Sequence, residues 1–136
     1  MIRLTQIDHV GIAVEDLERA VEDYRRLLGV EPAHRERLED QGVDEVLFPL
    51  GTSFIQLLGA LRPDTPVGRS LARRGPGLHH VAYRVDDIED ALEHLREGGA
   101  RLVDDAPRVG SRNTRIAFVH PASMHGALVE LVQEPA

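Results

Sequence analysis

Hydrophobic and polar residues alternate near the start of the chain and then change to a helical period. Val10, Ile12 and Val14 are apolar at every second position, which is typical of a strand with one buried face. From residue 17 to residue 28 the apolar positions recur three or four apart, so this stretch is predicted to form a helix. Asp16 is a suitable N-cap for that helix and Gly29 a suitable C-terminal stop.

The same pattern occurs a second time further along the chain. When His9 is aligned with His80, HVGIAVEDLERAVEDYRRLLG lies over HVAYRVDDIEDALEHLREGG, with Asp87 as the second N-cap. Later in each copy, FIQLL from Phe54 resembles LVELV from Leu128. Two copies of this length are too few for a solenoid, so they are expected to form one pseudo-symmetric domain.

Each copy is predicted to have the order β-α-β-β-β. The shorter strands after the helices are expected at 34–37, 44–50 and 54–58, and at 101–104, 115–119 and 127–132. Module 1 then spans about 7–58 and module 2 about 78–133, joined by a linker over 59–77 that holds a short helix from Pro66 to Leu71. The predicted fold is α+β, with residues 1–136 forming one pseudo-two-fold domain and a curved mixed sheet around a metal site.

Strand alternation places four polar side chains on the faces opposite the two helices. His9 and Gln56 lie on that face in the first copy, and His80 and Glu130 lie on it in the second. Singly, each is more often a hydrogen-bonded structural residue, but their equivalent places in a repeat favour a shared metal site. Two imidazole nitrogens and two oxygens suit Co²⁺, Mn²⁺, Ni²⁺, Zn²⁺ or Fe²⁺, and leave coordination positions open for a substrate.

The composition of the chain excludes several classes of function. The chain has 136 residues, 42% of them hydrophobic, with a net charge of −7 and no cysteine. The acidic balance argues against nucleic-acid or anionic-membrane partners, and the absence of cysteine excludes disulfides and thiolate chemistry. We recognise no signal peptide and no apolar run near the length of a membrane span, so a cytoplasmic location is expected.

The repeat and its polar positions resemble the vicinal-oxygen-chelate superfamily. Within it, DQGVDE, PVGRSLARRGPGLHHVAYRVDDIEDAL and AFVHPAS are similar to the methylmalonyl-CoA epimerase family over nearly the whole chain. The resemblance implies that His9, Gln56, His80 and Glu130 bind one divalent metal, with Co²⁺ favoured. It also implies that the substrate is methylmalonyl-CoA, that Glu45 is a catalytic acid/base, and that the protein is a homodimer.

The resemblance further implies that Glu130 doubles as the second acid/base, although a metal-bound carboxylate is a weakened base and a bound water could serve instead. Without the resemblance, Glu45 would be interpreted as an exposed charge. Ala122 replaces a lysine of the family's usual HPKS, so Arg108, Arg112 or Arg115 would supply any phosphate contact.

The remaining histidines are assigned lesser roles. His79 should point toward the helix as a structural residue, and His120 is a candidate for orienting substrate or a ligand. His34, His94 and His125 are interpreted as surface or loop residues.

The sequence is also compatible with two other functions. One is a glyoxalase-type lyase or isomerase with the same metal, which would lack the QGVDE phrase that contains Glu45. The other is a metal-free small-molecule-binding module, which would not keep all four ligand positions. An extradiol dioxygenase fits less well, because its iron uses two histidines and one glutamate, without a counterpart of Gln56.

Overall fold

The computed structural model describes residues 2–136, and the chain divides by its internal contacts into two units. The first unit is His9–His79, and the second combines the described residues up to Asp8 with His80–Ala136. Strand β1 (Leu4–Ala13) contributes its start to the second unit and its remainder to the first. The first unit thus contains most of the first copy, the linker and the start of β5 (Gly77–Val85), and the second unit contains most of the second copy.

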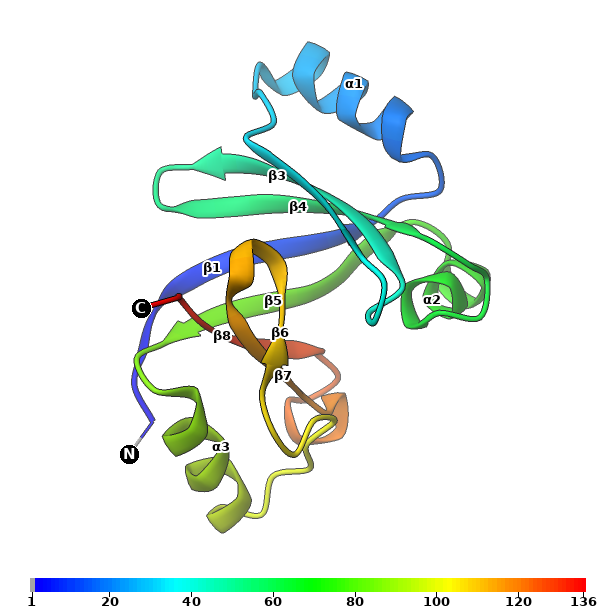
Figure 1. Ribbon diagram of the computed structural model, residues 1–136. Helices are drawn as coiled ribbons and strands as arrows, with labels where there is room; N and C mark the ends of the chain where they lie inside the picture. The colour runs from blue at the N-terminus through cyan, green and yellow to red at the C-terminus, as the bar shows by residue number, and fades with distance from the viewer. Residues whose placement is uncertain (1) are drawn as a thin grey trace. The chain divides into compact units, whose positions relative to one another are not determined.

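The first unit is a mixed sheet with two helices. Besides β1 it contains α1 (Leu17–Leu28), β2 (His34–Leu38), β3 (Val43–Leu50), β4 (Ser53–Ala60) and α2 (Pro66–Arg74). The strands follow the order β2-β3-β4-β1, antiparallel from β2 to β4 and parallel between β4 and β1. Helix α1 lies against β3 and β4 (Figure 1).

The second unit repeats this arrangement. It contains β5 (Gly77–Val85, from His80 onward), α3 (Ile88–Glu97), β6 (Arg108–Val109), β7 (Arg115–Val119) and β8 (Val129–Gln133). Its strands follow the order β1-β5-β8-β7-β6, with β5 parallel to β8 and the later strands antiparallel. The β-α-β-β-β order predicted for each copy is therefore confirmed, as is the α+β class. A single pseudo-two-fold domain over 1–136 stays a prediction.

The predicted helix ends are confirmed by their hydrogen bonds. The Asp16 carboxylate accepts the Arg19 N–H at 3.1 Å, and Asp87 caps α3 in the same way. Gly29 ends α1 with φ 68°, a left-handed conformation that favours glycine.

In each unit a helix packs on one face of the strands, and the polar positions lie on the other face. Beneath α1 the buried residues are Val46, Phe48 and Leu57, and the Phe48 ring stacks on Tyr24 with centroids 5.7 Å apart. The core beneath α3 is built in the same way from Val85, Ile88, Ala91, Leu92, Ala117, Val119, Val129 and Leu131. The predicted alternation is confirmed, because the intervening residues of β3, β4, β5 and β8 include the candidate site side chains.

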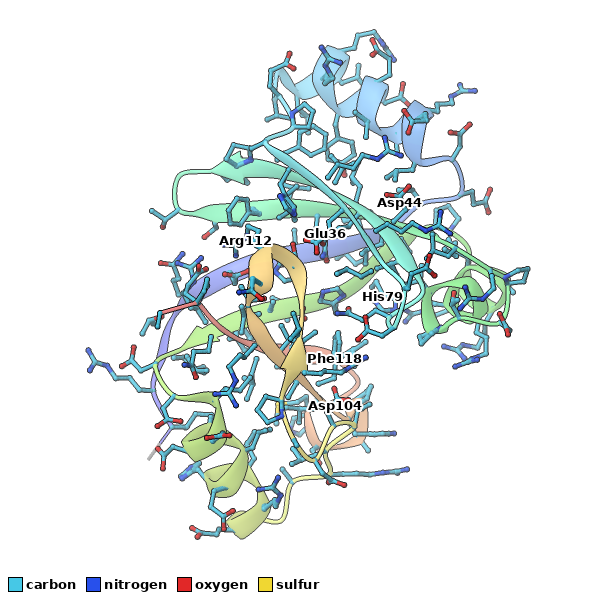
Figure 2. All side chains as sticks on the ribbon, viewed as in Figure 1. Glu36, Asp44, His79, Asp104, Arg112 and Phe118 are labelled. Carbon is cyan, nitrogen blue, oxygen red and sulfur yellow. The ribbon has the colours of Figure 1, made fainter. Side chains whose placement is uncertain are left out.

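The strand predicted at 101–104 is wrong. This segment makes only an isolated bridge between Leu102 and Val119, and the strand after α3 is the two-residue β6. The N–H groups of Val103 and Asp104 both donate to the carbonyl of Phe118, and the Asp104 carboxylate accepts the Phe118 N–H at 2.8 Å. The Asp104 side chain and the shared Phe118 carbonyl therefore take the place of a regular β-ladder in this segment. Asp104 and Phe118 are labelled in Figure 2.

Within residues 2–136, no helix combines the length and the apolar character that crossing a bilayer requires.

Candidate active site

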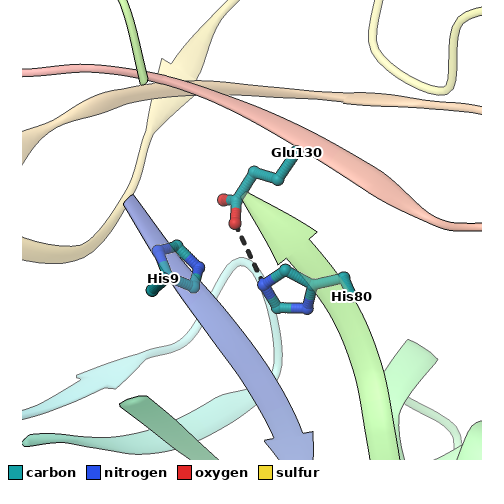
Figure 3. Close-up of side chains that lie close together, drawn as sticks. All are labelled: His9, His80 and Glu130. Atoms are coloured by element: carbon teal, nitrogen blue, oxygen red, sulfur yellow. Dashed lines mark ion pairs between the residues drawn. The ribbon is translucent and has the colours of Figure 1, made fainter. Parts of the chain in front are cut away.

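His80 and Glu130 form a buried ion pair on neighbouring strands of the second unit. Strands β5 and β8 run parallel with Ala82 opposite Glu130, so His80 lies two residues before that position on the same face. His80 Nε2 is 3.0 Å from Glu130 Oε1 (Figure 3), and the two side chains are only 4% and 6% exposed. The pair therefore presents a nitrogen donor and an oxygen donor together in a region shielded from water.

Apolar side chains surround this pair. Phe118 lies opposite Glu130 across β7 and β8, and its ring meets the His80 ring edge-on, with centroids 5.5 Å apart. Ala82, Ile116 and Val132 are buried on the same side of the sheet. An apolar surrounding strengthens electrostatic interactions and limits the rotamers of both polar groups.

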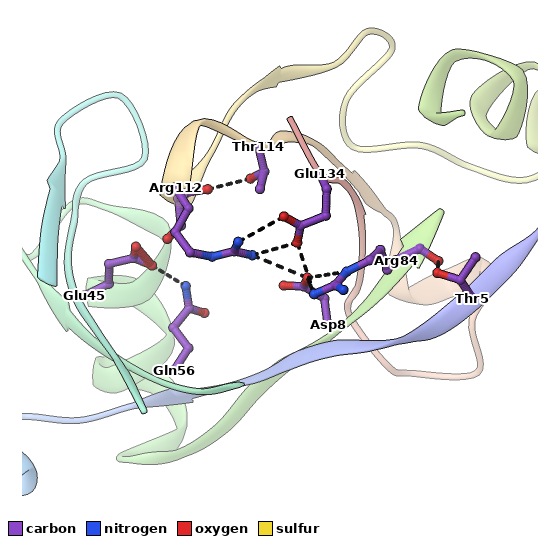
Figure 4. A network of polar contacts seen from close by, with 9 residues as sticks. Thr5, Asp8, Glu45, Gln56, Arg84, Arg112, Thr114 and Glu134 are labelled. Carbon is purple, nitrogen blue, oxygen red and sulfur yellow. Dashed lines mark hydrogen bonds and ion pairs between the residues drawn. The ribbon is translucent and has the colours of Figure 1, made fainter. Parts of the chain in front are cut away.

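Glu45 and Gln56 are joined in the first unit. Glu45 lies on β3 and is fully buried, at 0% exposed, while Gln56 lies on the adjacent β4 and is 5% exposed. Gln56 Nε2 donates to Glu45 Oε1 at 2.6 Å (Figure 4). The interpretation of Glu45 as an exposed charge is thus excluded, and the carboxylate shares the face of the candidate ligand Gln56.

The carbonyl oxygen of Gln56 is available for a further interaction. An ionised carboxylate only accepts hydrogen bonds, so the contact with Glu45 directs the amide nitrogen toward it and leaves Oε1 on the other side. Gln56 Oε1 is buried and has no hydrogen-bond partner among residues 2–136. A buried carbonyl without a partner is costly, and a metal ion is one group that would satisfy it.

His9 lies beside Gln56 in the first unit. Strands β1 and β4 run parallel, with His9 opposite Phe54 and Gly11 opposite Gln56, so His9 and Gln56 are diagonal neighbours on one face. His9 is 5% exposed. Both side chains are therefore buried on the face of the sheet away from α1.

A third polar group next to Glu45 was not predicted. His34 and Glu36 lie on β2, and Glu36 is directly opposite Glu45 across β2 and β3. His34 Nε2 is 2.8 Å from Glu36 Oε1, and one ligand atom from each of His34, Glu36 and Glu45 lies within 4.8 Å of the others. His34 lies in β2 and not in a loop, and its side chain is partly exposed; alternation in HRERL would have placed His34 and Glu36 on one face.

The arginines considered for phosphate binding are held by acids in the second unit. Arg112 forms a two-pronged contact with Glu134, with both N···O distances at 3.1 Å, and also approaches Asp8 (Figure 4). Arg108 and Arg115 contact Asp104 and Glu89 in turn. A phosphate contact from any of these arginines would replace an existing ion pair.

His120 has a structural contact that was not predicted. Its Nδ1 accepts the Ala122 N–H at 3.0 Å and caps the short turn Pro121–Ser123. His79 is half-buried, beside the buried His80 on β5.

The donors found in each unit suit a divalent metal. The first unit offers the His9 imidazole and the Gln56 carbonyl, and the second offers the His80 imidazole and the Glu130 carboxylate. Imidazole nitrogens combined with amide and carboxylate oxygens bind Co²⁺, Mn²⁺, Ni²⁺ and Zn²⁺. The donor set therefore fits the metal that the sequence predicts.

Comparisons with known proteins identify the family of the chain. The family model of the glyoxalase/bleomycin resistance protein/dioxygenase superfamily matches residues 8–118. The ethylmalonyl-CoA/methylmalonyl-CoA epimerase of Cereibacter sphaeroides is 37% identical over 130 residues, covering 94% of this chain and 97% of the relative.

Two solved structures extend the similarity to three dimensions. A methylmalonyl-CoA epimerase in complex with methylmalonyl-CoA and NH4+ is 43% identical, with a TM-score of 0.96 over 98% of this chain and 97% of that one. The Mycobacterium tuberculosis methylmalonyl-CoA epimerase is 40% identical, with a TM-score of 0.94 over 98% of this chain and 90% of that one. The chain therefore belongs to the glyoxalase/bleomycin resistance protein/dioxygenase superfamily and, within it, to the methylmalonyl-CoA epimerase family of isomerases.

Proposed function

We propose that this chain interconverts the 2R and 2S epimers of methylmalonyl-CoA with the help of one divalent metal ion. The relatives that carry this name support the reaction, and one of them is described with the substrate bound. The observation that carries the proposal is the placement of Glu45. A fully buried carboxylate, hydrogen-bonded to a candidate ligand on the face away from the helix, has the environment of an acid/base group.

The proposed metal ligands are His9, Gln56, His80 and Glu130. Support comes from their equivalent places in the two copies, from the ion pair of His80 with Glu130, and from the buried carbonyl of Gln56. When bound, the metal would supply positive charge that offsets the substrate carboxylate and the negative charge developing on the thioester oxygen. Co²⁺ is the proposed ion, and Mn²⁺, Ni²⁺ or Zn²⁺ would suit the same donors.

Glu45 is proposed to remove the C2 proton from one face of the substrate. Its carboxylate is held by the Gln56 amide at 2.6 Å and is excluded from water, so its position is defined before the substrate enters. Removal of the proton gives a planar enolate that has lost the configuration of C2.

Return of a proton on the opposite face needs a second group. Glu130 is proposed for this role as well as for metal binding, because it is a buried carboxylate on the face away from the helix, equivalent in the second copy to Gln56 in the first. Two carboxylates acting from opposite faces would account for inversion in both directions.

The direct test is exchange of the C2 proton of methylmalonyl-CoA in D2O, followed by NMR on the metal-loaded protein. The proposal expects deuterium at C2 together with formation of the other epimer. Failure of the metal-loaded protein to do either would overturn it. The predicted homodimer is a separate proposal, tested by light scattering in solution.

A further inference from the structure

We propose that His34 and Glu36 form the route by which the proton taken up by Glu45 reaches solvent. This inference rests on the proposed epimerase function and assigns His34 and Glu36 as positioning residues that act through Glu45.

The three side chains share one face of the first sheet. Glu36 on β2 lies directly opposite Glu45 on β3, and His34 lies two residues earlier on the same face. His34 Nε2 is hydrogen-bonded to Glu36 Oε1 at 2.8 Å, and one ligand atom of each of the three residues lies within 4.8 Å of the others. A proton can pass between such groups by small side-chain movements or through one water.

Exposure increases along this row of side chains. Glu45 is 0% exposed, whereas the side chains of His34 and Glu36 are 32% and 33% exposed. The pair therefore reaches both the buried carboxylate and water. An imidazole has two ring nitrogens and can take a proton on one and give one from the other, which suits the partly exposed His34 to the solvent end of the route.

The proton balance of epimerisation requires such a route. After one turnover Glu45 carries the proton taken from C2, and the opposite group has given one to the product. Before a second molecule of the same epimer can react, Glu45 must lose its proton and the opposite group must regain one from solvent. The Glu45 carboxylic acid passes its proton to the Glu36 carboxylate. The Glu36 acid then donates to His34 Nε2 in the tautomer that carries the imidazole proton on Nδ1, and the resulting imidazolium releases one proton to water or buffer.

The test separates this return step from chemistry on the substrate. His34→Gln and Glu36→Gln are compared with His94→Gln, an exposed histidine on α3, in the metal-loaded protein with one epimer as substrate. For each variant, the rate of the first C2–H cleavage is measured by rapid quench and compared with kcat in weakly buffered solution. We expect the first cleavage to stay within about twofold of the parent, while kcat of His34→Gln and Glu36→Gln falls at least about tenfold.

Added imidazole should restore kcat of His34→Gln, because a small base in solvent can replace the missing ring, and should leave His94→Gln unchanged. An unchanged kcat for His34→Gln in weak buffer would overturn the inference. So would an equal loss in the first cleavage, or a loss that imidazole does not restore. An inactive parent protein would instead overturn the proposed function, and this inference with it.

Discussion

Replacement of Glu45 by glutamine removes a proton acceptor from the first unit and leaves the volume of the side chain almost unchanged. General acid–base groups contribute about 10²- to 10⁴-fold to rate, which corresponds to about 3–5 kcal/mol of transition-state stabilisation. Because Glu45 is fully buried, no bulk water is positioned to replace it. We therefore expect Glu45→Gln to lose C2 proton exchange in D2O by a factor in this range.

The rest of the molecule should be little affected by this change. In the parent, Gln56 Nε2 donates to the Glu45 carboxylate at 2.6 Å. The amide oxygen of the new glutamine can accept the same hydrogen bond, so Gln56 should keep its orientation. Metal content measured by elemental analysis should match the parent. The melting temperature should not fall, since a neutral amide is easier to bury than a carboxylate.

Asp44→Asn is the matched control for this prediction. Asp44 is the neighbour of Glu45 on β3 and points to the opposite face, where Arg35 Nη2 donates to it at 3.0 Å. Its exchange rate should stay within about twofold of the parent, because a partly exposed ion pair contributes little. Parent-like exchange in Glu45→Gln, with full metal content, would refute the assignment of Glu45 as the base.

Three further changes test the fold and the second unit. Glu130→Ala should abolish metal binding and exchange, because it removes a proposed ligand together with its buried contact to His80; parent-like metal content would contradict this. Phe48→Ala should lower the free energy of unfolding in urea titration by about 3–5 kcal/mol, because a fully buried ring is lost. A decrease of less than about 1 kcal/mol would contradict the packing described beneath α1. Gly68→Ala should lower the melting temperature, because a Cβ there would lie 2.5 and 2.6 Å from two carbonyl oxygens of the preceding loop, whereas Gly98→Ala, with its nearest atom at 3.5 Å, should not.

Most of the fold follows from two periodicities that can be read directly from the chain. Alternation located β1 and β5, and the spacing of apolar residues located α1 and α3 with their aspartate caps. The prediction of a strand at 101–104 was wrong because the Asp104 carboxylate, and not a backbone carbonyl, accepts the Phe118 N–H. Such competition between a side chain and the backbone depends on tertiary contacts that no local pattern contains.

For the candidate site, the sequence predicted the face on which each side chain lies within its own strand, but not the contacts between strands. Alternation placed Gln56 and Glu130 on the faces away from the helices, and the structure confirms both faces. The contact between Glu45 and Gln56 was not predictable, because it depends on the register of β3 against β4, which the intervening turn determines. For the same reason the pairing of Glu36 with Glu45 was missed, although both residues lie in predicted strands.

The measurement that tests the central claim most directly is the number of Co²⁺ ions bound per chain, determined by titration with elemental analysis. One divalent ion held jointly by His9, Gln56, His80 and Glu130 predicts a single Co²⁺ per chain. It also predicts that His9→Ala and His80→Ala each lose that ion, although they change different copies of the repeat. A chain that binds no stoichiometric Co²⁺, or that keeps it in either variant, would contradict the account.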